Sequence, residues 1–276
     1  MHRIIYHYLN RAMAKKKYDK KTFLQIMLLD ALFCILLGLA AYKLLLTIAP
    51  HATAVSQMVA EQMQAAGQVG QLLTREEVYQ SLMGNEQFLA YYSEILDGVL
   101  LLALAFIILY CLLQSVTWWL ALGKPLPFMK YLYRFSLVSL AWFLALIAVL
   151  LVYANAAQGI DSLFIPGAFR ALYFLLLIAA VLFISYFLVL CYYFLKEKSW
   201  GVMLKKTFAT GFKRFKSLFW KFLLIGAGKL GLLIFVVILV SVLGINLLVG
   251  AILFLVLVIP YVAWAKLKLV RIIENV

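Results

Sequence analysis

Long runs of apolar residues, separated by short polar or basic segments, dominate the chain. A helix needs about 20 apolar residues to cross the roughly 30 Å hydrocarbon core of a bilayer. The runs that meet this length predict membrane spans over residues 23–48, 98–122, 135–154, 171–195, 222–243 and 247–265. The predicted fold is therefore all-α, a polytopic transmembrane bundle of six helices that forms a single integral membrane domain over residues 1–276.

One connection between the predicted spans is long enough to form structure of its own, the outer loop over residues 49–97. Small and amphipathic positions after Pro50 predict a first helix there. A capping box at Thr74 opens a second short helix, and Asn85 is expected to cap a third helix that runs into the second span. By contrast, the turn-forming residues 244–246 alone separate the last two spans.

Residues 199–221 combine aromatic and basic side chains at helical spacing, just before the fifth span. This pattern predicts an interfacial amphipathic helix that lies flat on the membrane. A calmodulin-like partner site and a nucleic-acid patch are alternatives, but direct attachment to a span favours the membrane surface. The predicted lipid or partner interface comprises Lys205, Lys206, Phe208, Phe212, Lys213, Arg214, Phe215 and Lys216.

Composition and charge fit a membrane protein and set its orientation. Hydrophobic residues make up 67% of the chain and charged residues 13%, whereas a soluble domain carries about 25% charged residues. The net charge is +14, and of the 25 lysines and arginines only Lys43, Arg75, Arg170 and Lys229 do not fall on one side of the predicted spans. Cytoplasmic segments carry such an excess, so we expect both termini to be cytoplasmic in a plasma-membrane protein. Anionic lipid headgroups are the expected partners and nucleic acid is not.

Charged residues inside predicted spans are costly and therefore become candidates for function. Asp30 in the first span and Lys229 in the fifth lie at a similar depth, which predicts an ion pair between these spans. Gln114, Ser115 and Ser139 reach the same level and complete a predicted intramembrane polar layer. Two interpretations stay open: the layer fixes which helices pack together, or it lines a site for a substrate.

Two further features of the last spans predict local structure. Pro260 has no backbone N–H, so the carbonyl of Val256 is expected to lose its helical partner. Ala227 and Gly231 form a small-xxx-small pair that predicts close helix packing.

The sequence offers little for catalysis or metal binding. Cys34, Cys111 and Cys191 are scattered through the spans, which favours neither a disulfide framework nor a metal site. No histidine has a carboxylate or cysteine at ligand spacing. We therefore expect no metal, no cofactor and no catalytic residues, and the sequence argues against an enzyme.

The C-terminal part carries a resemblance to known proteins. The segments are Lys205-Lys-Thr-Phe, Gly211-Phe-Lys-Arg-Phe and Phe219-Trp-Lys-Phe-Leu-Leu, then a glycine-containing hairpin and Ala265-Lys-Leu-Lys-Leu. This string, within residues 200–276, resembles prokaryotic six-span membrane proteins of unknown function. Those proteins are similar to the membrane domain attached to some glycerophosphodiester phosphodiesterases. The soluble catalytic domain of such enzymes is absent, so the resemblance implies no enzyme activity.

The favoured functional hypothesis is a non-enzymatic scaffold or accessory subunit that engages lipid or a partner membrane protein. The alternative is a small permease or transporter component that uses the polar layer around Asp30 and Lys229. A lipid-modifying enzyme is the third hypothesis.

Overall fold

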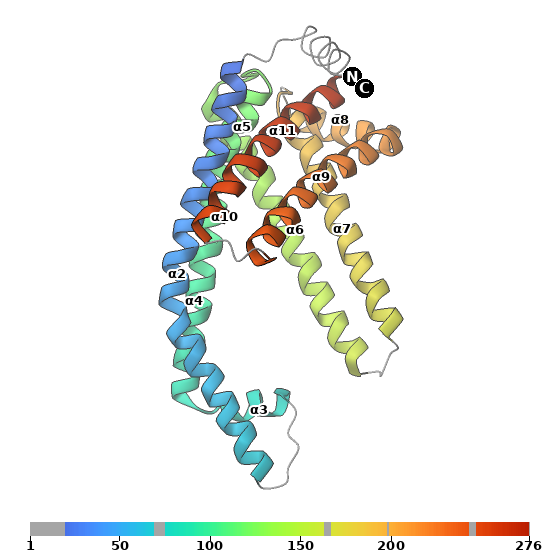
Figure 1. The fold of residues 1–276 in the computed structure, drawn as a ribbon. Helices are drawn as coiled ribbons and strands as arrows, with labels where there is room; N and C mark the ends of the chain where they lie inside the picture. The colour runs from blue at the N-terminus through green and yellow to red at the C-terminus, as the bar shows by residue number, and fades with distance from the viewer. Residues whose placement is uncertain (1–19, 69–74, 163–166, 198, 243–246, 276) are drawn as a thin grey trace. The chain divides into compact units, whose positions relative to one another are not determined.

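The structure of the chain, a computed structural model, describes residues 20–68, 75–162, 167–197, 199–242 and 247–275. Within these ranges the chain forms helices and no strand, which confirms the predicted all-α class (Figure 1). Backbone contacts divide the chain into two compact units, Phe33–Tyr110 and Met1–Leu32 with Cys111–Val276. These are called the short unit and the main unit. The single membrane domain expected from the sequence stays a prediction.

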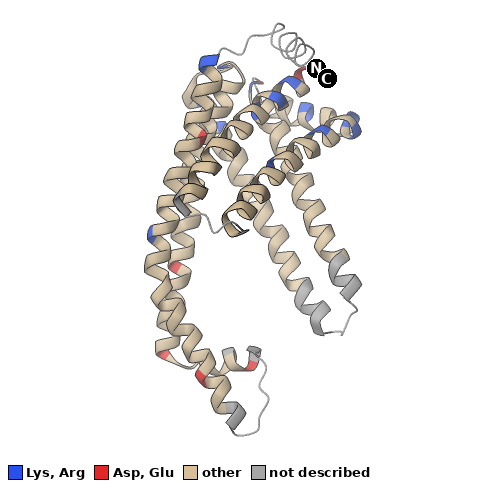
Figure 2. Cartoon of the chain, viewed as in Figure 1, with Lys and Arg blue, Asp and Glu red and all other residues tan. Residues whose placement is uncertain are grey.

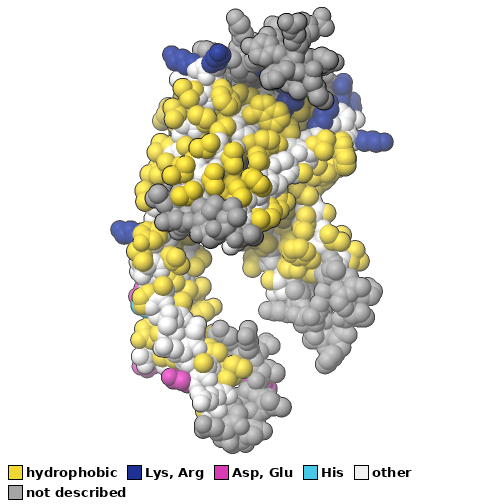
Figure 3. Space-filling view, in the orientation of Figure 1, with side chains coloured by type: hydrophobic (Ala, Val, Ile, Leu, Met, Phe, Trp, Pro, Cys, Tyr) yellow, Lys and Arg dark blue, Asp and Glu magenta, His cyan; other side chains and the backbone are white. Residues whose placement is uncertain are grey.

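Helices long and apolar enough to cross a membrane make up most of the chain. Among the described residues they are Lys20–Ala65, Glu86–Ala121, Phe128–Asn155, Leu172–Phe194, Phe215–Ser241 and Val249–Glu274. Many of their large apolar side chains are exposed on the molecule, and hydrophobic atoms cover much of the face seen in Figure 3. Such a surface is costly in water but suits lipid, because acyl chains are as apolar as leucine. The chain is therefore a multi-pass integral membrane protein.

Two long helices pack side by side in the short unit. Helix α2 (Lys20–Gln68) contributes its residues from Phe33 onward, and α4 (Glu86–Leu109) returns beside it (Figure 1). The ring of Phe33 meets that of Phe106 edge to face, with centroids 6.0 Å apart. Further along, a Cβ at Gly98 would lie only 2.5 Å from Ile48 Cδ1, so glycine permits this close approach.

The described residues of the predicted outer loop are helical, apart from the short connection at residues 83–85. Helix α3 (Arg75–Leu82) packs Val78 and Leu82 against Val55 of α2 and Phe88 of α4. Asn85 caps α4 as predicted, because its side chain accepts hydrogen bonds from the backbone of Gln87 and Phe88.

The beginning of this outer region differs from the prediction in one respect. No separate helix starts after Pro50, because α2 continues through this proline to Gln68. Pro50 removes one backbone hydrogen bond of this helix, and Val55 after it packs into the apolar core of the short unit. The predicted capping residue Thr74 lies outside the described residues.

The centre of the main unit is formed by α5 (Ser115–Ala121), α6 (Phe128–Ser162) and α7 (Gly167–Phe194). Tyr192 of α7 joins them. Its ring stacks on Phe135 at 4.3 Å and lies 5.5 Å from Trp118, measured between centroids. Its hydroxyl lies 2.7 Å from the Ser139 hydroxyl, so the one polar atom of this buried ring is paired.

The predicted interfacial segment consists of two helices instead of one. Ser199 caps α8 (Trp200–Lys213), which ends at Arg214, and α9 (Phe215–Val242) then begins. Gly211 allows α8 to lie against α7, since a Cβ there would come within 2.5 Å of Phe187 Cε1. The prediction of one continuous helix over residues 199–221 is wrong because the chain turns at Arg214, whose φ and ψ are −117° and 23°.

Two five-residue π-helical turns interrupt the spans. One is η1 (Tyr110–Gln114), between α4 and α5. The other is η2 (Phe254–Val258), between α10 (Leu247–Leu253) and α11 (Ile259–Glu274). The second contains Val256, four residues before Pro260, so the lost helical hydrogen bond predicted there coincides with a change of helix type. The predicted turn at residues 244–246 and the basic segment before Lys20 lie outside the described residues.

Helices α9 and α11 approach each other closely at Gly228, and not at the predicted pair of Ala227 and Gly231. The Tyr261 hydroxyl donates to the carbonyl of Ile225 at 3.0 Å, passing over Gly228. A Cβ at Gly228 would lie 2.1 Å from that hydroxyl, whereas one at Gly231 would meet nothing within 4 Å. Ala227 is exposed, so the small-xxx-small pair predicted there does not make this contact.

We expect Gly228→Ala to destabilise the protein by about 1–3 kcal/mol, because the added methyl group must displace Tyr261 from its hydrogen bond. Thermal unfolding in detergent measures the effect. Gly231→Ala is the matched control, and we expect it to be neutral or slightly stabilising because alanine favours a helix. Equal losses in the two variants would contradict the contact.

Candidate functional site

A buried ion pair joins the first and last spans within the main unit. Lys266 of α11 places its Nζ 2.5 Å from Oδ1 of Asp30 on α2. Asp30 is 2% exposed and Lys266 is 8% exposed. Two charges removed from solvent to this degree are stable only when they are paired and hydrogen-bonded.

The rest of the ammonium is also satisfied. Lys266 Nζ donates to Gln114 Oε1 at 2.6 Å and to Thr117 Oγ1 at 3.0 Å. Gln114 in turn donates through Nε2 to Asp30 Oδ1 at 3.0 Å. A lysine ammonium has three N–H groups, and this cluster gives it an aspartate, an amide and a hydroxyl as acceptors. We call Asp30, Gln114, Thr117 and Lys266 the polar lock.

The π-helical turns contain or precede three of the four residues of the polar lock, Gln114, Thr117 and Lys266. Gln114 is the last residue of η1, and Thr117 follows within α5, where its hydroxyl donates to the Gln114 carbonyl at 2.9 Å. Lys266 lies on α11, which follows η2. A π-helical turn adds a residue to one turn and so rotates every side chain beyond it. Both turns thereby set the direction in which the polar side chains point.

Lys266 was missed by the sequence analysis, although a signal was present. Ala263, Lys266, Leu267 and Val270 follow the i, i+3, i+4, i+7 spacing of one helix face, and all are buried. Ending the sixth span at residue 265 made Lys266 look like an ordinary flanking base. The helical period of the apolar residues beyond that point would have placed it on the inner face.

The predicted ion pair between Asp30 and Lys229 is wrong. Lys229 is exposed on α9, in a stretch where Ala227 and Leu230 are exposed as well. Equal depth in the bilayer does not determine which helices are neighbours or which faces meet. The carboxylate of Asp30 therefore pairs with a base on a different span.

The remaining members of the predicted polar layer, Ser115 and Ser139, are buried, and their hydrogen bonds go to groups other than Asp30 and Lys266. Ser115 Oγ donates to the carbonyl of Leu112 at 2.8 Å. Ser139 pairs with the hydroxyl of Tyr192. Of the predicted layer, the structure brings together Asp30 and Gln114, and Thr117 and Lys266 complete the cluster.

The basic residues predicted for the interface are exposed where α8 and α9 meet. We call the set the basic elbow, and it comprises Lys205, Lys206, Lys213, Arg214 and Lys216. Phe208 and Phe212 of α8 are 49% and 61% exposed. The opposite face of α8 is buried through Met203, Thr207 and Gly211. Figure 2 shows the basic residues of α8 and early α9 at the same end of the main unit as those of α11.

Phe215 departs from the predicted interface. It is only half-buried, stacks on Phe219 at 4.6 Å and meets the ring of Tyr186 edge to face at 5.7 Å. The break at Arg214 changes the helical phase, so Phe215 turns toward α7 instead of continuing the exposed aromatic row.

Arg134 of α6 holds the backbone between the end of α7 and the start of α8, which leads into the basic elbow. It is 6% exposed and donates to the carbonyls of Glu197 and Leu195, the latter at 3.4 Å, just beyond the end of α7. Its guanidinium also lies 5.6 Å from the centre of the Trp200 ring. A cation at a helix C-terminus satisfies unpaired carbonyls and opposes the helix dipole. From the sequence alone, Arg134 is only one of the many basic residues on one side of the predicted spans.

Two lysines beside the elbow have partners close to them in the sequence. Glu197 pairs with Lys206 at 2.8 Å, while Lys196 places its ammonium 3.7 Å from the centre of the Tyr193 ring. Burial lowers the pKa of Lys196, the carboxylates of Glu274 and Glu197 act in the opposite direction, and Lys206 lowers it further.

No group of three or more histidine, cysteine, aspartate or glutamate side chains in the described residues could hold a metal ion. Nor does any known family model, curated protein or solved structure match the chain. The polar lock and the basic elbow are therefore the features of the molecule that bear on its function.

Removing either Lys266 or Asp30 from the polar lock should leave the other charge buried without its partner. We expect Lys266→Met or Asp30→Leu alone to cost about 3–5 kcal/mol in stability, and the double variant to cost less than either single one. Thermal unfolding in detergent tests the coupling. Lys229→Met, the control, should change stability by less than about 0.5 kcal/mol. A double variant that loses the sum of the single effects would show that the pair is unimportant.

Proposed function

We propose that the protein is a non-enzymatic membrane component, a scaffold or accessory subunit, that engages anionic lipid headgroups through its basic elbow. The observation that carries this proposal is the division of α8 into two faces. Its buried face packs against the bundle, while its lysines and the rings of Phe208 and Phe212 are exposed together.

This combination suits the boundary between lipid and water. An amphipathic helix can bury aromatic side chains at the headgroup level while its basic residues remain among the headgroups. Each lysine or arginine near an anionic surface contributes about 1 kcal/mol of attraction. A partner membrane protein with an acidic surface is the second kind of ligand that the elbow could bind.

Charge distribution supports a plasma-membrane location with both termini cytoplasmic. Most described basic residues of the main unit gather toward the end where α8 begins and α11 finishes (Figure 2). In the described part of the short unit, acidic residues outnumber Lys43 and Arg75. Because basic segments resist translocation, the basic end is assigned to the cytoplasm.

The permease hypothesis receives less support from the geometry. Its polar layer depended on Asp30 and Lys229, but Lys229 is exposed and Asp30 is enclosed by Lys266 and Gln114. The short distances within the polar lock fit a role in fixing the packing of α2, α5 and α11.

The assigned orientation predicts which positions a membrane-impermeant maleimide can reach. In a background with Cys34, Cys111 and Cys191 replaced by alanine, we expect Ser56→Cys to be labelled in intact cells. We expect Ser217→Cys, an equally exposed position, to be labelled only after permeabilisation. Labelling of Ser217→Cys in intact cells would reverse the orientation.

Lipid selectivity tests the basic elbow directly. We expect wild-type protein to bind phosphatidylglycerol in preference to phosphatidylcholine from an equimolar mixture, as measured by native mass spectrometry. The triple variant Lys205→Gln, Lys213→Gln and Lys216→Gln should lose most of this preference, since three lysines contribute about 3 kcal/mol in total.

The control for this experiment removes the same charge elsewhere in the main unit. Lys20→Gln, Lys124→Gln and Lys130→Gln also replace three exposed lysines, and this variant should keep at least half of the wild-type preference in free-energy terms. If both triple variants lose it equally, net charge and not the elbow determines lipid selection.

A further inference from the structure

One lysine lies in the middle of a span, within α9 of the main unit. Lys229 follows Lys221 by about two helical turns, a rise of about 12 Å at 1.5 Å per residue. Its side chain is exposed, and within the described part of the chain it takes part in no ion pair or hydrogen bond. A charge that faces lipid at such a depth is costly, and it therefore marks a candidate functional position.

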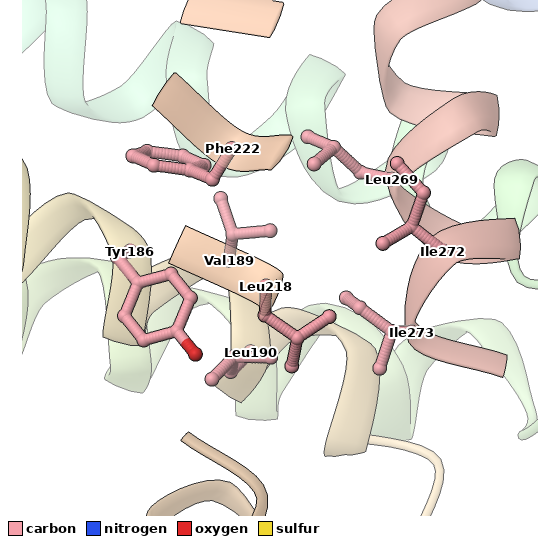
Figure 4. Close-up of a pocket in the computed structure, with 8 residues that line it drawn as sticks. All are labelled: Tyr186, Val189, Leu190, Leu218, Phe222, Leu269, Ile272 and Ile273. Carbon is pink, nitrogen blue, oxygen red and sulfur yellow. The ribbon is translucent and has the colours of Figure 1, made fainter. Parts of the chain in front are cut away.

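The contacts of α9 inside the main unit do not neutralise this charge. At the start of the helix, Leu218 and Phe222 line the same small apolar space as Ile273 of α11 (Figure 4). Further along, Tyr261 of α11 donates its hydroxyl to the carbonyl of Ile225. None of these contacts includes a carboxylate.

Lys229 belongs to an uncovered strip of α9. Gly226, Lys229, Leu233 and Val237 follow the i, i+3, i+7, i+11 spacing of one helix face, and all four are exposed. We call this set the lysine strip. A Cβ added at Gly226 would meet no atom within 4 Å, and a glycine on an open helix face lets the backbone of a second helix come close. The strip thus combines room for a helix with one positive charge.

The charge determines which kind of helix fits the strip. An ammonium inside the bilayer is stabilised by a carboxylate at the same depth. Within the six apolar runs of the sequence, Asp30 is the one carboxylate, and it is enclosed by Lys266 and Gln114 in the polar lock. A second copy of this chain therefore offers no carboxylate to Lys229 at this level.

We infer that the lysine strip docks a transmembrane helix of a different membrane protein, one that carries an aspartate or glutamate at the depth of Lys229. The carboxylate pairs with Lys229, and the backbone of the partner helix passes over Gly226. This inference deepens the accessory-subunit part of the proposed function and rests on it, although it uses a surface separate from the basic elbow. The isolated protein leaves Lys229 unpaired, which agrees with the small effect on stability expected for Lys229→Met.

Model transmembrane peptides test the pairing. The probe is a leucine–alanine helix with one aspartate about two turns inside its apolar segment and a dansyl group at the nearer end; its counterpart has leucine in place of the aspartate. In phosphatidylcholine vesicles, tryptophans of the full-length protein, including the exposed Trp220 of α9, transfer energy to bound peptide. We expect the aspartate peptide to half-saturate the protein at an at least about fivefold lower peptide-to-lipid ratio than the leucine peptide. Equal binding of the two peptides, the result for a lysine that extends to lipid phosphates, would overturn the inference.

Matched variants separate pairing at Lys229 from general charge. Lys229→Leu should bind both peptides alike, and Lys229→Glu should prefer a peptide with lysine in place of the aspartate. Lys221→Gln removes a base from an earlier turn of the same helix and should keep at least half of the wild-type preference in free-energy terms. Gly226→Leu should weaken binding of the aspartate peptide although Lys229 is intact, because its side chain occupies the space for the second helix. Thermal unfolding temperatures close to that of wild type establish that the variants are folded.

Crosslinking in cells identifies the occupant of the strip. Benzoylphenylalanine at Leu233 should capture a second membrane protein that has a carboxylate within a span, and Lys229→Leu in the same background should abolish the capture. Capture that persists in Lys229→Leu would overturn the inference. Capture of only a second copy of this chain, of lipid, or of a protein with no carboxylate in its spans would overturn it as well.

The outcomes distinguish this inference from the lipid-engaging function. If the aspartate peptide gains nothing from Lys229 while the elbow variant loses its lipid selectivity, helix docking is overturned and the lipid-engaging function stands. If the peptide preference depends on Lys229 while the elbow variant keeps its lipid selectivity, the lipid-engaging function fails and helix docking stands.

Discussion

The buried ammonium of Lys266 is the constraint on which the main unit depends. A charge in this position is tolerable only while Asp30, Gln114 and Thr117 all reach it. These acceptors lie on α2, η1 and α5, so one side chain of α11 fixes three other elements. Apolar contacts between transmembrane helices are poorly directional, because lipid competes for the same surfaces. The pairing of Lys266 with Asp30 therefore helps to determine which helices pack together.

The two π-helical turns of the backbone, η1 and η2, lie close in the sequence to residues of the polar lock. A π-helical turn weakens regular helical hydrogen bonding and persists where surrounding packing holds it. Here η1 ends at Gln114, and η2 precedes the proline-started helix that carries Lys266. The strongest polar contacts of the bundle therefore coincide with the positions at which its helices depart from regular geometry.

Away from the polar lock, the basic elbow uses charge in a different way. Arg134 and Glu197 hold the backbone that leads into α8, while the bases farther along remain exposed. Buried charge in this protein thus fixes structure, whereas the bases of the elbow are exposed and Lys206 among them pairs with Glu197. Tyr186 of α7 anchors α8 beside the elbow through its hydrogen bond to the carbonyl of Gly211.

Apolar run lengths in the sequence determined the helical membrane class, and local signals such as Asn85 determined a helix start, because both depend on residues close together in the chain. The partner of Asp30 depended on tertiary structure. Depth along the predicted spans pointed to Lys229, and only the packing of helix faces decides that Lys266 reaches the carboxylate. The turn at Arg214 and the contact at Gly228 were likewise decided by neighbouring helices, since a sequence pattern shows which residues share a face but not what that face meets.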